Sequence, residues 1–468
     1  MLFPIGISQI GVLQDTFLLC IVPVLVAAVF YFRRFRDGTE YKLLFVYWIW
    51  FWLSRALNGS PLLDHDFRVF FDLSLMLPFF AFGAAMTKTE RVRFLDWLSA
   101  VIGGFYFIIG MIALVAFLNR SMYEIPALGG KIGIVREASY ARINFFDIHP
   151  NISAYWYLIS LILMIYQFFH CEKKFWRIPV LLSAVLDLIV IAITYSRSVR
   201  LCMAMAFGLL TAMLLYQVLQ SKPRFLRMVL AFFAAGFVLV AAYEGSGLFA
   251  DVMATLSYDV VDNSLASEAG EQKAAPEDVV RAQDRISAFP VPLASGEKGS
   301  MDAAPLRNGL VQSDPRPKTG DLNDLSSNRI AIYRAAFQAI AEKPSVLWRG
   351  QFCGDVMTIP HRILGPDVPG GSPTHLHNTL LQILMTAGVP GLLLAAIFLL
   401  LVFYKGLCSL FSGKLLLDDR ILILSVLSVL PHIMVEAYLF TSTDLRTLFF
   451  FLMCGMVAGT YGEKGSSI

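Results

Sequence analysis

The chain has 468 residues, of which 57% are hydrophobic and only 16% are charged, and its mean hydropathy is +0.64. Soluble domains carry about a quarter charged residues, so this composition excludes an ordinary soluble protein and indicates a polytopic membrane protein. The formal net charge of +3 gives no support for nucleic-acid binding. The six cysteines lack the spacing of a metal site, so we expect packing roles for them, and we expect neither a metal nor another cofactor.

Eleven apolar runs are long enough to cross a bilayer as helices. The first has no basic segment before it and no clear cleavage site after it, which favours a membrane span over a signal peptide. The runs cover residues 10–32, 41–57, 68–86, 97–117, 151–169, 178–194, 199–219, 227–245, 378–404, 421–439 and 445–462.

Basic clusters follow every second predicted span. Since positive residues are retained in cytoplasmic loops, this spacing predicts an orientation in the plasma (inner) membrane. The N-terminus and the longest loop would be extracytoplasmic, and the C-terminus would be cytoplasmic. The clustered residues are Arg33, Arg34, Arg36, Lys88, Arg91, Arg93, Lys173, Lys174, Arg177, Lys222, Arg224, Arg227, Lys405, Lys414 and Arg420.

The spans divide the chain into an N-terminal bundle over residues 1–245, an extracytoplasmic loop over 246–376 and a C-terminal bundle over 377–468. Within the loop, residues 263–325 are rich in small and polar residues without a periodic apolar face, which predicts disorder. Residues 327–341 carry apolar side chains at helical spacing and predict an amphipathic helix.

Arginine and histidine residues gather near span ends on the predicted outer face, where the positive-inside rule disfavours them. An anionic ligand is a natural compensation. Simpler roles remain open, namely arginines that reach lipid phosphates, a solvated helix arginine, an interfacial imidazole and an asparagine that only caps a helix. The residues are Arg142, His149, Asn151, Arg197, Arg200, Arg329, Arg334, His375, His377 and Asn378.

Among the ionisable residues inside predicted spans, three are candidates for a buried pair or a cavity lining. His432 and Glu436 lie four residues apart on one face of the tenth span, and Asp187 lies in the sixth. Such residues pair with one another or face a cavity. No zinc signature, nucleophile elbow or phosphate-binding glycine loop accompanies them.

One stretch, "HNTLLQILMTAGVPGLLLAA" at residues 377–396, resembles the signature of the O-antigen ligase and polymerase family. Three further segments resemble that family in the same order: "HPNISAYW" from 149, "TYSRS" from 194 and "NRIAIYRAAFQAIAEKPSVLWRGQFCG" from 328. Cys353 stands where a glycine is common. The resemblance covers residues 140–396 and implies an all-α polytopic fold like that of the GT-C glycosyltransferases, with about 11–12 transmembrane helices.

The resemblance also implies a metal-independent, inverting glycosyltransferase that takes a glycan from an undecaprenyl-diphosphate carrier. The acceptor would be a sugar hydroxyl on a glycan or lipid-linked molecule at the outer side of the membrane, as in lipopolysaccharide and other surface polysaccharide biosynthesis. His377 would be the catalytic histidine, and Arg197 and Arg329 would bind the donor diphosphate. Candidates for donor or acceptor contacts are Arg142, His149, Arg200, Arg334, His375, Asn378 and Glu436.

The chemistry suits these residue types. An imidazole can take the proton of an attacking hydroxyl, and arginine binds phosphate oxygens bidentately. The main alternative is a flippase for the same lipid-linked oligosaccharide or another polytopic transporter, in which Asp187, His432 and Glu436 would line a path. The candidate residues gather at the outer face rather than at the midplane, which favours the enzyme. Ligase, polymerase and protein-directed activities stay open, as does the identity of the sugars.

Overall fold

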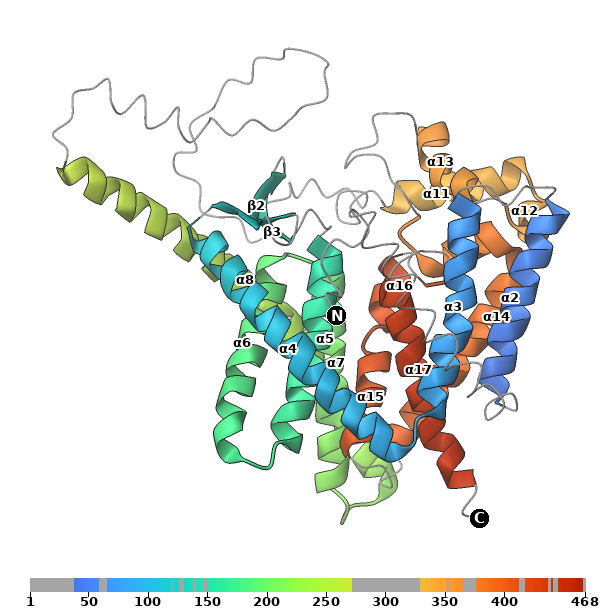
Figure 1. The fold of residues 1–468 in the computed structure, drawn as a ribbon, viewed down its shortest axis with the longest axis horizontal. Helices are drawn as coiled ribbons and strands as arrows, with labels where there is room; N and C mark the ends of the chain where they lie inside the picture. Colours follow the sequence, from blue (N-terminus) through green and yellow to red (C-terminus); the bar gives the residue numbers. More distant parts are fainter. Residues whose placement is uncertain are drawn as a thin grey trace.

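The computed structural model is a helical bundle with a small sheet and three short helices at one end (Figure 1). It describes residues 38–58, 65–119, 121–125, 130–137, 140–145, 150–271, 329–351, 353–364, 376–411, 417–436, 439–440 and 445–465. The helices are α2 (Thr39–Leu57), α3 (His65–Ala85), α4 (Lys88–Leu118), α5 (Pro150–His170), η2 (Lys174–Trp176), α6 (Arg177–Ile193), α7 (Arg197–Val218), α8 (Arg224–Glu271), α11 (Arg329–Glu342), α12 (Val346–Arg349), α13 (Cys353–Leu364), α14 (Thr379–Leu410), α15 (Leu417–Leu427), α16 (Leu430–Val435) and α17 (Leu445–Gly465).

Six helices in the described part of the chain are long and apolar enough to cross a membrane, which confirms a multi-pass membrane protein. They are fewer than the 11–12 expected. Shorter apolar stretches lie in α3 (Leu73–Ala85) and α17 (Arg446–Thr460), and the first predicted span, 10–32, lies outside the described residues. The six are Lys88–Leu118, Pro150–His170, Lys174–Ile193, Arg197–Val218, Arg224–Ala250 and Thr379–Leu410.

The predicted tenth span, 421–439, is interrupted. α15 ends at Leu427, and α16 begins at Leu430 with Pro431 in its first turn. Proline lacks an N–H, and its ring would meet the carbonyl four residues earlier, so a continuous helix cannot pass this point. The chain becomes extended again at Glu436, the residue that follows α16. Glu436 therefore lies outside a regular helix, directly after the short α16.

Two ends of the bundle differ in what they carry (Figure 1). The connections α3–α4, α5–α6 and α7–α8, which hold predicted cytoplasmic basic clusters, lie together at the lower end in the view. The sheet, α11, α12, α13 and the beginning of α14 lie at the upper end. These three connections therefore share one end of the bundle, and the described parts of the predicted outer segments named here share the other.

A three-stranded antiparallel sheet, absent from the all-α expectation, follows α4. Strand β2 (Gly130–Glu137) pairs with both β1 (Met122–Ile125) and β3 (Tyr140–Phe145). Ile132, Ile143 and Phe145 are buried, and the Phe145 ring lies 5.4 Å from that of Tyr157 on α5. The alternation of apolar residues in "KIGIV" and "RINF" is the strand signal that a search for membrane spans overlooks.

Two segments of the predicted loop can be compared with the structure. α8 continues to Glu271, past the expected end of the eighth span at residue 245 and into the segment 263–325 that was expected to be disordered. Residues 272–325 lie outside the described residues. The amphipathic helix expected over 327–341 corresponds to α11, whose Ile332, Ala335, Ala336 and Ala339 are buried.

A break in α14 anchors the short helices to the bundle. Gly388 has left-handed backbone angles (φ 68°), and a Cβ there would lie 2.6 Å from the Trp348 carbonyl oxygen of α12. Gly350, which directly follows α12, also has a positive φ (63°) and packs closely against the backbone of α14. Glycine tolerates these angles because it has no Cβ.

Side chains of α2 donate hydrogen bonds to backbone carbonyls on both sides of the contact between α12 and α14. The buried Arg55 guanidinium donates to the Gln351 and Thr386 carbonyls, and Trp50 Nε1 donates to the Ala387 carbonyl at 2.7 Å. The segment that carries α11 is therefore fixed relative to the beginning of α14.

Candidate functional site

Four segments that are distant in sequence meet at the upper end of the bundle. Asn151 lies in the first turn of α5, Arg329 begins α11, His377 lies just before α14 and Glu436 follows α16. Glu436 is the residue that the other three contact. The convergence places the two predicted functional residues Arg329 and His377 at one site.

The Glu436 carboxylate has partners on both oxygens. Its Oε1 accepts a hydrogen bond from Asn151 Nδ2 at 2.8 Å and lies 3.3 Å from Arg329 Nη2. Its Oε2 lies 3.6 Å from His377 Nδ1. The Glu436 side chain is 7% exposed, whereas those of Arg329 and His377 are 22% and 26% exposed. A buried carboxylate thus organises two cationic or proton-binding groups that remain accessible to a ligand.

Asn378 fixes the backbone beside the site. Its Oδ1 accepts from the Leu381 N–H at 2.9 Å as a helix cap, and its Nδ2 donates to the Met434 carbonyl at 2.9 Å. Thr379 Oγ1 donates to the Glu436 carbonyl at 2.7 Å. The capping role considered for Asn378 is therefore present, and the same side chain ties α14 to α16.

His377 itself has left-handed backbone angles (φ 49°), which cost a non-glycine residue about 1–2 kcal/mol. Tyr333 of α11 donates its hydroxyl to the His377 carbonyl at 3.0 Å. Burial is the largest of the effects that raise the pKa of Tyr333, so its hydroxyl stays protonated and able to donate. Tyr333 follows Arg329 by one helical turn, so α11 contributes two side chains to one face of the site.

α7 and α16 pack together, so Arg197 at the beginning of α7 and Glu436 at the end of α16 belong to neighbouring helices. Arg197 is half-buried and begins α7, with its guanidinium near a helix N-terminus.

Arg200 has a different place. Its Nε donates to Ser246 Oγ at 2.9 Å and its Nη2 to the Tyr243 carbonyl at 2.8 Å, both on α8. The guanidinium also lies 4.9 Å from the centre of the Tyr243 ring. These contacts hold α7 against α8. Arg334 is exposed on α11.

Three predicted contact residues cannot be placed at the site. Arg142 lies in β3 opposite Val135, but its side chain is not described, and His149 and His375 lie outside the described residues. Their proposed roles stay predictions.

A second polar cluster lies one helical turn below Glu436. The His432 ring stacks on Tyr155 with centroids 5.2 Å apart, and its Nε2 lies 3.2 Å from Arg446 Nη1. All three residues are buried. Arg446 was not singled out from the sequence, although it is another arginine at a predicted outer span end. Asp187, the third of these intramembrane candidates, is buried in α6 beside Tyr106 and Tyr157.

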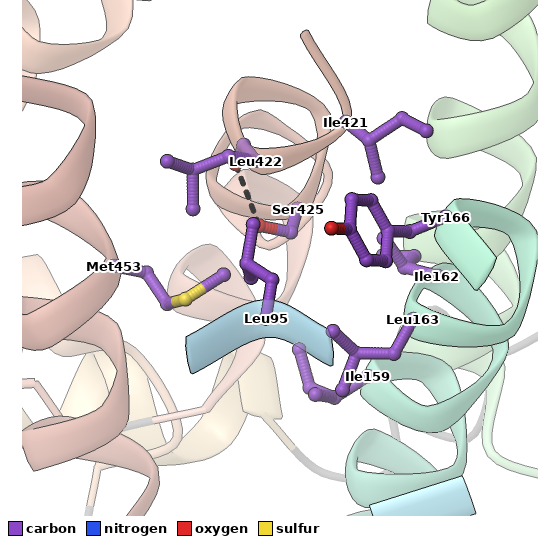
Figure 2. Close-up of a pocket in the computed structure, with 9 residues that line it drawn as sticks. All are labelled: Leu95, Ile159, Ile162, Leu163, Tyr166, Ile421, Leu422, Ser425 and Met453. Atoms are coloured by element: carbon purple, nitrogen blue, oxygen red, sulfur yellow. Dashed lines mark hydrogen bonds between the residues drawn. The ribbon is translucent and has the colours of Figure 1, made fainter. Parts of the chain in front are cut away.

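A small apolar pocket lies toward the opposite end of the bundle, among α4, α5, α15 and α17 (Figure 2). Ser425 Oγ within it donates to its own helix, at the Leu422 carbonyl. Such a lining suits hydrocarbon rather than a sugar or a diphosphate. The lining residues are Leu95, Ile159, Ile162, Leu163, Tyr166, Ile421, Leu422, Ser425 and Met453.

Within the described ranges, no three His, Cys, Asp or Glu side chains gather as metal ligands. The site instead combines an imidazole, a guanidinium and a carboxylate. It can accept a proton at the imidazole and bind an anion at the guanidinium.

Comparison with known proteins gives one match. Residues 182–396 match the family model described as O-antigen ligase. The matched region contains Arg197, Arg329 and His377, whereas Asn151 and Glu436 lie outside it. No curated protein and no solved structure matches the chain significantly.

Proposed function

On the basis of this match, which confirms the resemblance to the O-antigen ligase and polymerase family, we propose that the protein is a glycosyltransferase of surface polysaccharide assembly. It moves a glycan from undecaprenyl diphosphate to a sugar hydroxyl of a glycan or lipid-linked acceptor, at the outer side of the plasma membrane. The observation that carries the proposal is the meeting of His377 and Arg329 at one buried carboxylate, on the bundle end opposite the basic loops.

His377 acts as the general base in this mechanism. Its Nδ1 is buried and faces Glu436, so Nε2 is the atom assigned to the acceptor hydroxyl. As that hydroxyl oxygen forms a bond to the anomeric carbon, the bond from this carbon to the phosphate oxygen breaks. The hydroxyl proton passes to Nε2, and attack opposite the leaving group inverts the anomeric centre. General-base help of this kind contributes about 10²–10⁴ in rate.

Arg329 and Arg197 stabilise the departing undecaprenyl diphosphate. The charge that gathers on the leaving group can be shared by two guanidinium groups in bidentate hydrogen bonds, without requiring a metal. The N-terminus of α7 adds a favourable dipole beside Arg197. Because α7 and α11 bring these arginines from separate parts of the chain, the donor is positioned as well as stabilised.

The proposal is tested by a transfer assay in detergent or liposomes. Purified protein is incubated with an undecaprenyl-diphosphate oligosaccharide and candidate acceptors, with and without EDTA. We expect product in the presence of EDTA and a loss of about 10²–10⁴ in rate for His377→Ala. The size of the product separates ligation from polymerisation.

Arg362→Ala is a matched control for Arg329→Ala, because Arg362 is an exposed arginine of α13 whose partner is Glu342 at 3.2 Å. It should retain activity, while Arg329→Ala should lose donor binding. Equal rates for wild type and His377→Ala would remove His377 from the chemistry. Movement of lipid-linked sugar across liposomes without any product would favour the flippase.

A further inference from the structure

We propose that Glu436 is a positioning residue that exchanges partners during the reaction. In the absence of donor its carboxylate pairs with Arg329, and once Arg329 binds the diphosphate it accepts the Nδ1–H of His377. The exchange, which rests on the proposed function, makes activation of the base depend on arrival of the donor.

In the structure, the Glu436 carboxylate is engaged on the arginine side. Oε1 holds Asn151 at 2.8 Å and Arg329 at 3.3 Å, whereas the 3.6 Å from Oε2 to His377 Nδ1 exceeds hydrogen-bond length. Closing that gap requires a shift of well under 1 Å. Asn151 can keep its hydrogen bond to Oε1 during such a shift, so it holds one carboxylate oxygen in place while the other moves toward His377.

Because the Glu436 carboxylate is buried, it requires a new partner when Arg329 leaves it. A carboxylate that is 7% exposed cannot lose a cationic partner without a substantial desolvation cost. When Arg329 turns to the more accessible diphosphate, the His377 Nδ1–H is the donor already facing the second oxygen. The resulting carboxylate–imidazole pair fixes the proton on Nδ1 and makes Nε2 a better base.

Other charged or titratable groups face this carboxylate from each element packed around it. Tyr333 is occupied by the His377 carbonyl, and Arg446 and His432 contact each other one turn below. Among the residues that the structure describes, the groups near the carboxylate are Arg329 and Tyr333 of α11 and His377 before α14, with His432 of α16 and Arg446 of α17 one turn below.

The donor diphosphate and Glu436 compete for Arg329, because each of them binds its guanidinium. The donor must displace Glu436 from Arg329, so the carboxylate weakens donor binding while it strengthens the base. Removing its charge should therefore change binding and catalysis in opposite directions. A purely structural residue would impair both.

The test is Glu436→Gln, which keeps the shape and an acceptor oxygen. We expect undecaprenyl diphosphate to bind about two- to fivefold more tightly, which is the strength of a partly exposed ion pair. We expect kcat to fall at least tenfold, and up to about 10⁴-fold as in catalytic dyads that lose their carboxylate. The acid limb of the pH–rate profile should move to lower pH, because the imidazole loses a negative neighbour.

Glu40→Gln is the matched control. Glu40 is also a buried carboxylate, but it pairs with Lys405 at the opposite end of the bundle, so donor binding and pH profile should stay at wild-type values. If Glu436→Gln does not fold, Glu436→Asp serves instead. Its shorter side chain can keep Arg329 but cannot also reach His377, so donor binding should stay within twofold while kcat falls at least tenfold.

Weaker donor binding in parallel with lower kcat would overturn the exchange, and so would an unchanged kcat and acid limb. These results are distinct from failure of the proposed function. If His377→Ala abolishes transfer while Glu436→Gln behaves as wild type, the glycosyltransferase assignment stands and only the exchange is wrong. If His377→Ala is fully active, the assignment itself fails.

Discussion

Gly388→Ala tests whether the break in α14 positions the site. The residue has φ 68°, and a Cβ would lie 2.6 Å from the Trp348 carbonyl oxygen and 2.9 Å from that of Leu347. At φ 68° and ψ −176° the backbone lies in a region that is essentially restricted to glycine, so an alanine there costs about 1–3 kcal/mol. Forced overpacking adds about 1–3 kcal/mol, which together give about 2–6 kcal/mol against the docked arrangement. Because the overlapping atoms are backbone, they cannot move away as a flexible side chain would.

The expected consequence reaches Arg329, since α12 and α11 belong to one short connected segment. Displacement of α12 from α14 should move Arg329 away from Glu436 and His377. Misplacement by about 1 Å can cost 10²-fold in rate, so we expect kcat/KM for the donor to fall at least tenfold. The melting temperature in detergent should fall by several degrees.

Gly236→Ala is the control, because a Cβ on this α8 residue would meet open space. It should leave the melting temperature unchanged or slightly higher. A Gly388→Ala protein with wild-type melting and wild-type donor kcat/KM would refute the view that this contact fixes α11 on the bundle.

Further expected outcomes concern individual contacts. Tyr333→Phe removes a hydrogen bond worth about 0.5–1.5 kcal/mol to the strained His377, so kcat should fall about two- to tenfold. Since the pKa of Tyr333 is raised and its neutral form donates, that deficit should be constant up to pH 10, as rates measured from pH 6 to 10 would show. Arg55→Met leaves two carbonyls of the α12–α14 contact without their donor and should destabilise by about 2–4 kcal/mol, measured as a lower melting temperature and faster proteolysis. Arg200→Ala should lower stability without changing the donor KM, whereas Arg197→Ala should raise that KM; the reverse pattern would exchange their roles.

The structure brings two of the predicted site residues, Arg329 and His377, together at Glu436, whereas its helices differ from several of the predicted spans. Arg329 and His377 could be found because arginine and histidine at predicted outer span ends violate the charge pattern of membrane proteins. The same criterion also selects Arg446, which lies at the outer end of the last predicted span. Arg197 and Arg200 could not be separated by any local pattern, because the difference arises from Ser246 and Tyr243 of α8, which lie about fifty residues away.

Hydropathy also misjudged two elements for physical reasons. It treats Pro431 as one residue in an apolar run, although the missing N–H divides the run into α15 and α16. It also passes over strands β2 and β3, whose period of two carries too few apolar residues to resemble a span. Both elements lie next to the candidate site, since α16 ends directly before Glu436 and the sheet packs through Phe145 onto α5, the helix that carries Asn151.

The ranking of Glu436 below the basic residues shows what a list of candidate ligands misses. An anionic substrate makes cationic residues the obvious candidate ligands. Two cationic or proton-binding groups, however, cannot be held together at a membrane surface without a counter-charge. Glu436 supplies that charge to Arg329 and His377 at once, and Asn151 orients it. Both residues lie outside the 182–396 region that matches the family model. In the proposed mechanism, the matched region supplies the reacting groups and the flanking segments supply the carboxylate that positions them. A chimera that exchanges only residues 397–468 should therefore alter the pH–rate profile even though His377 and both arginines are unchanged.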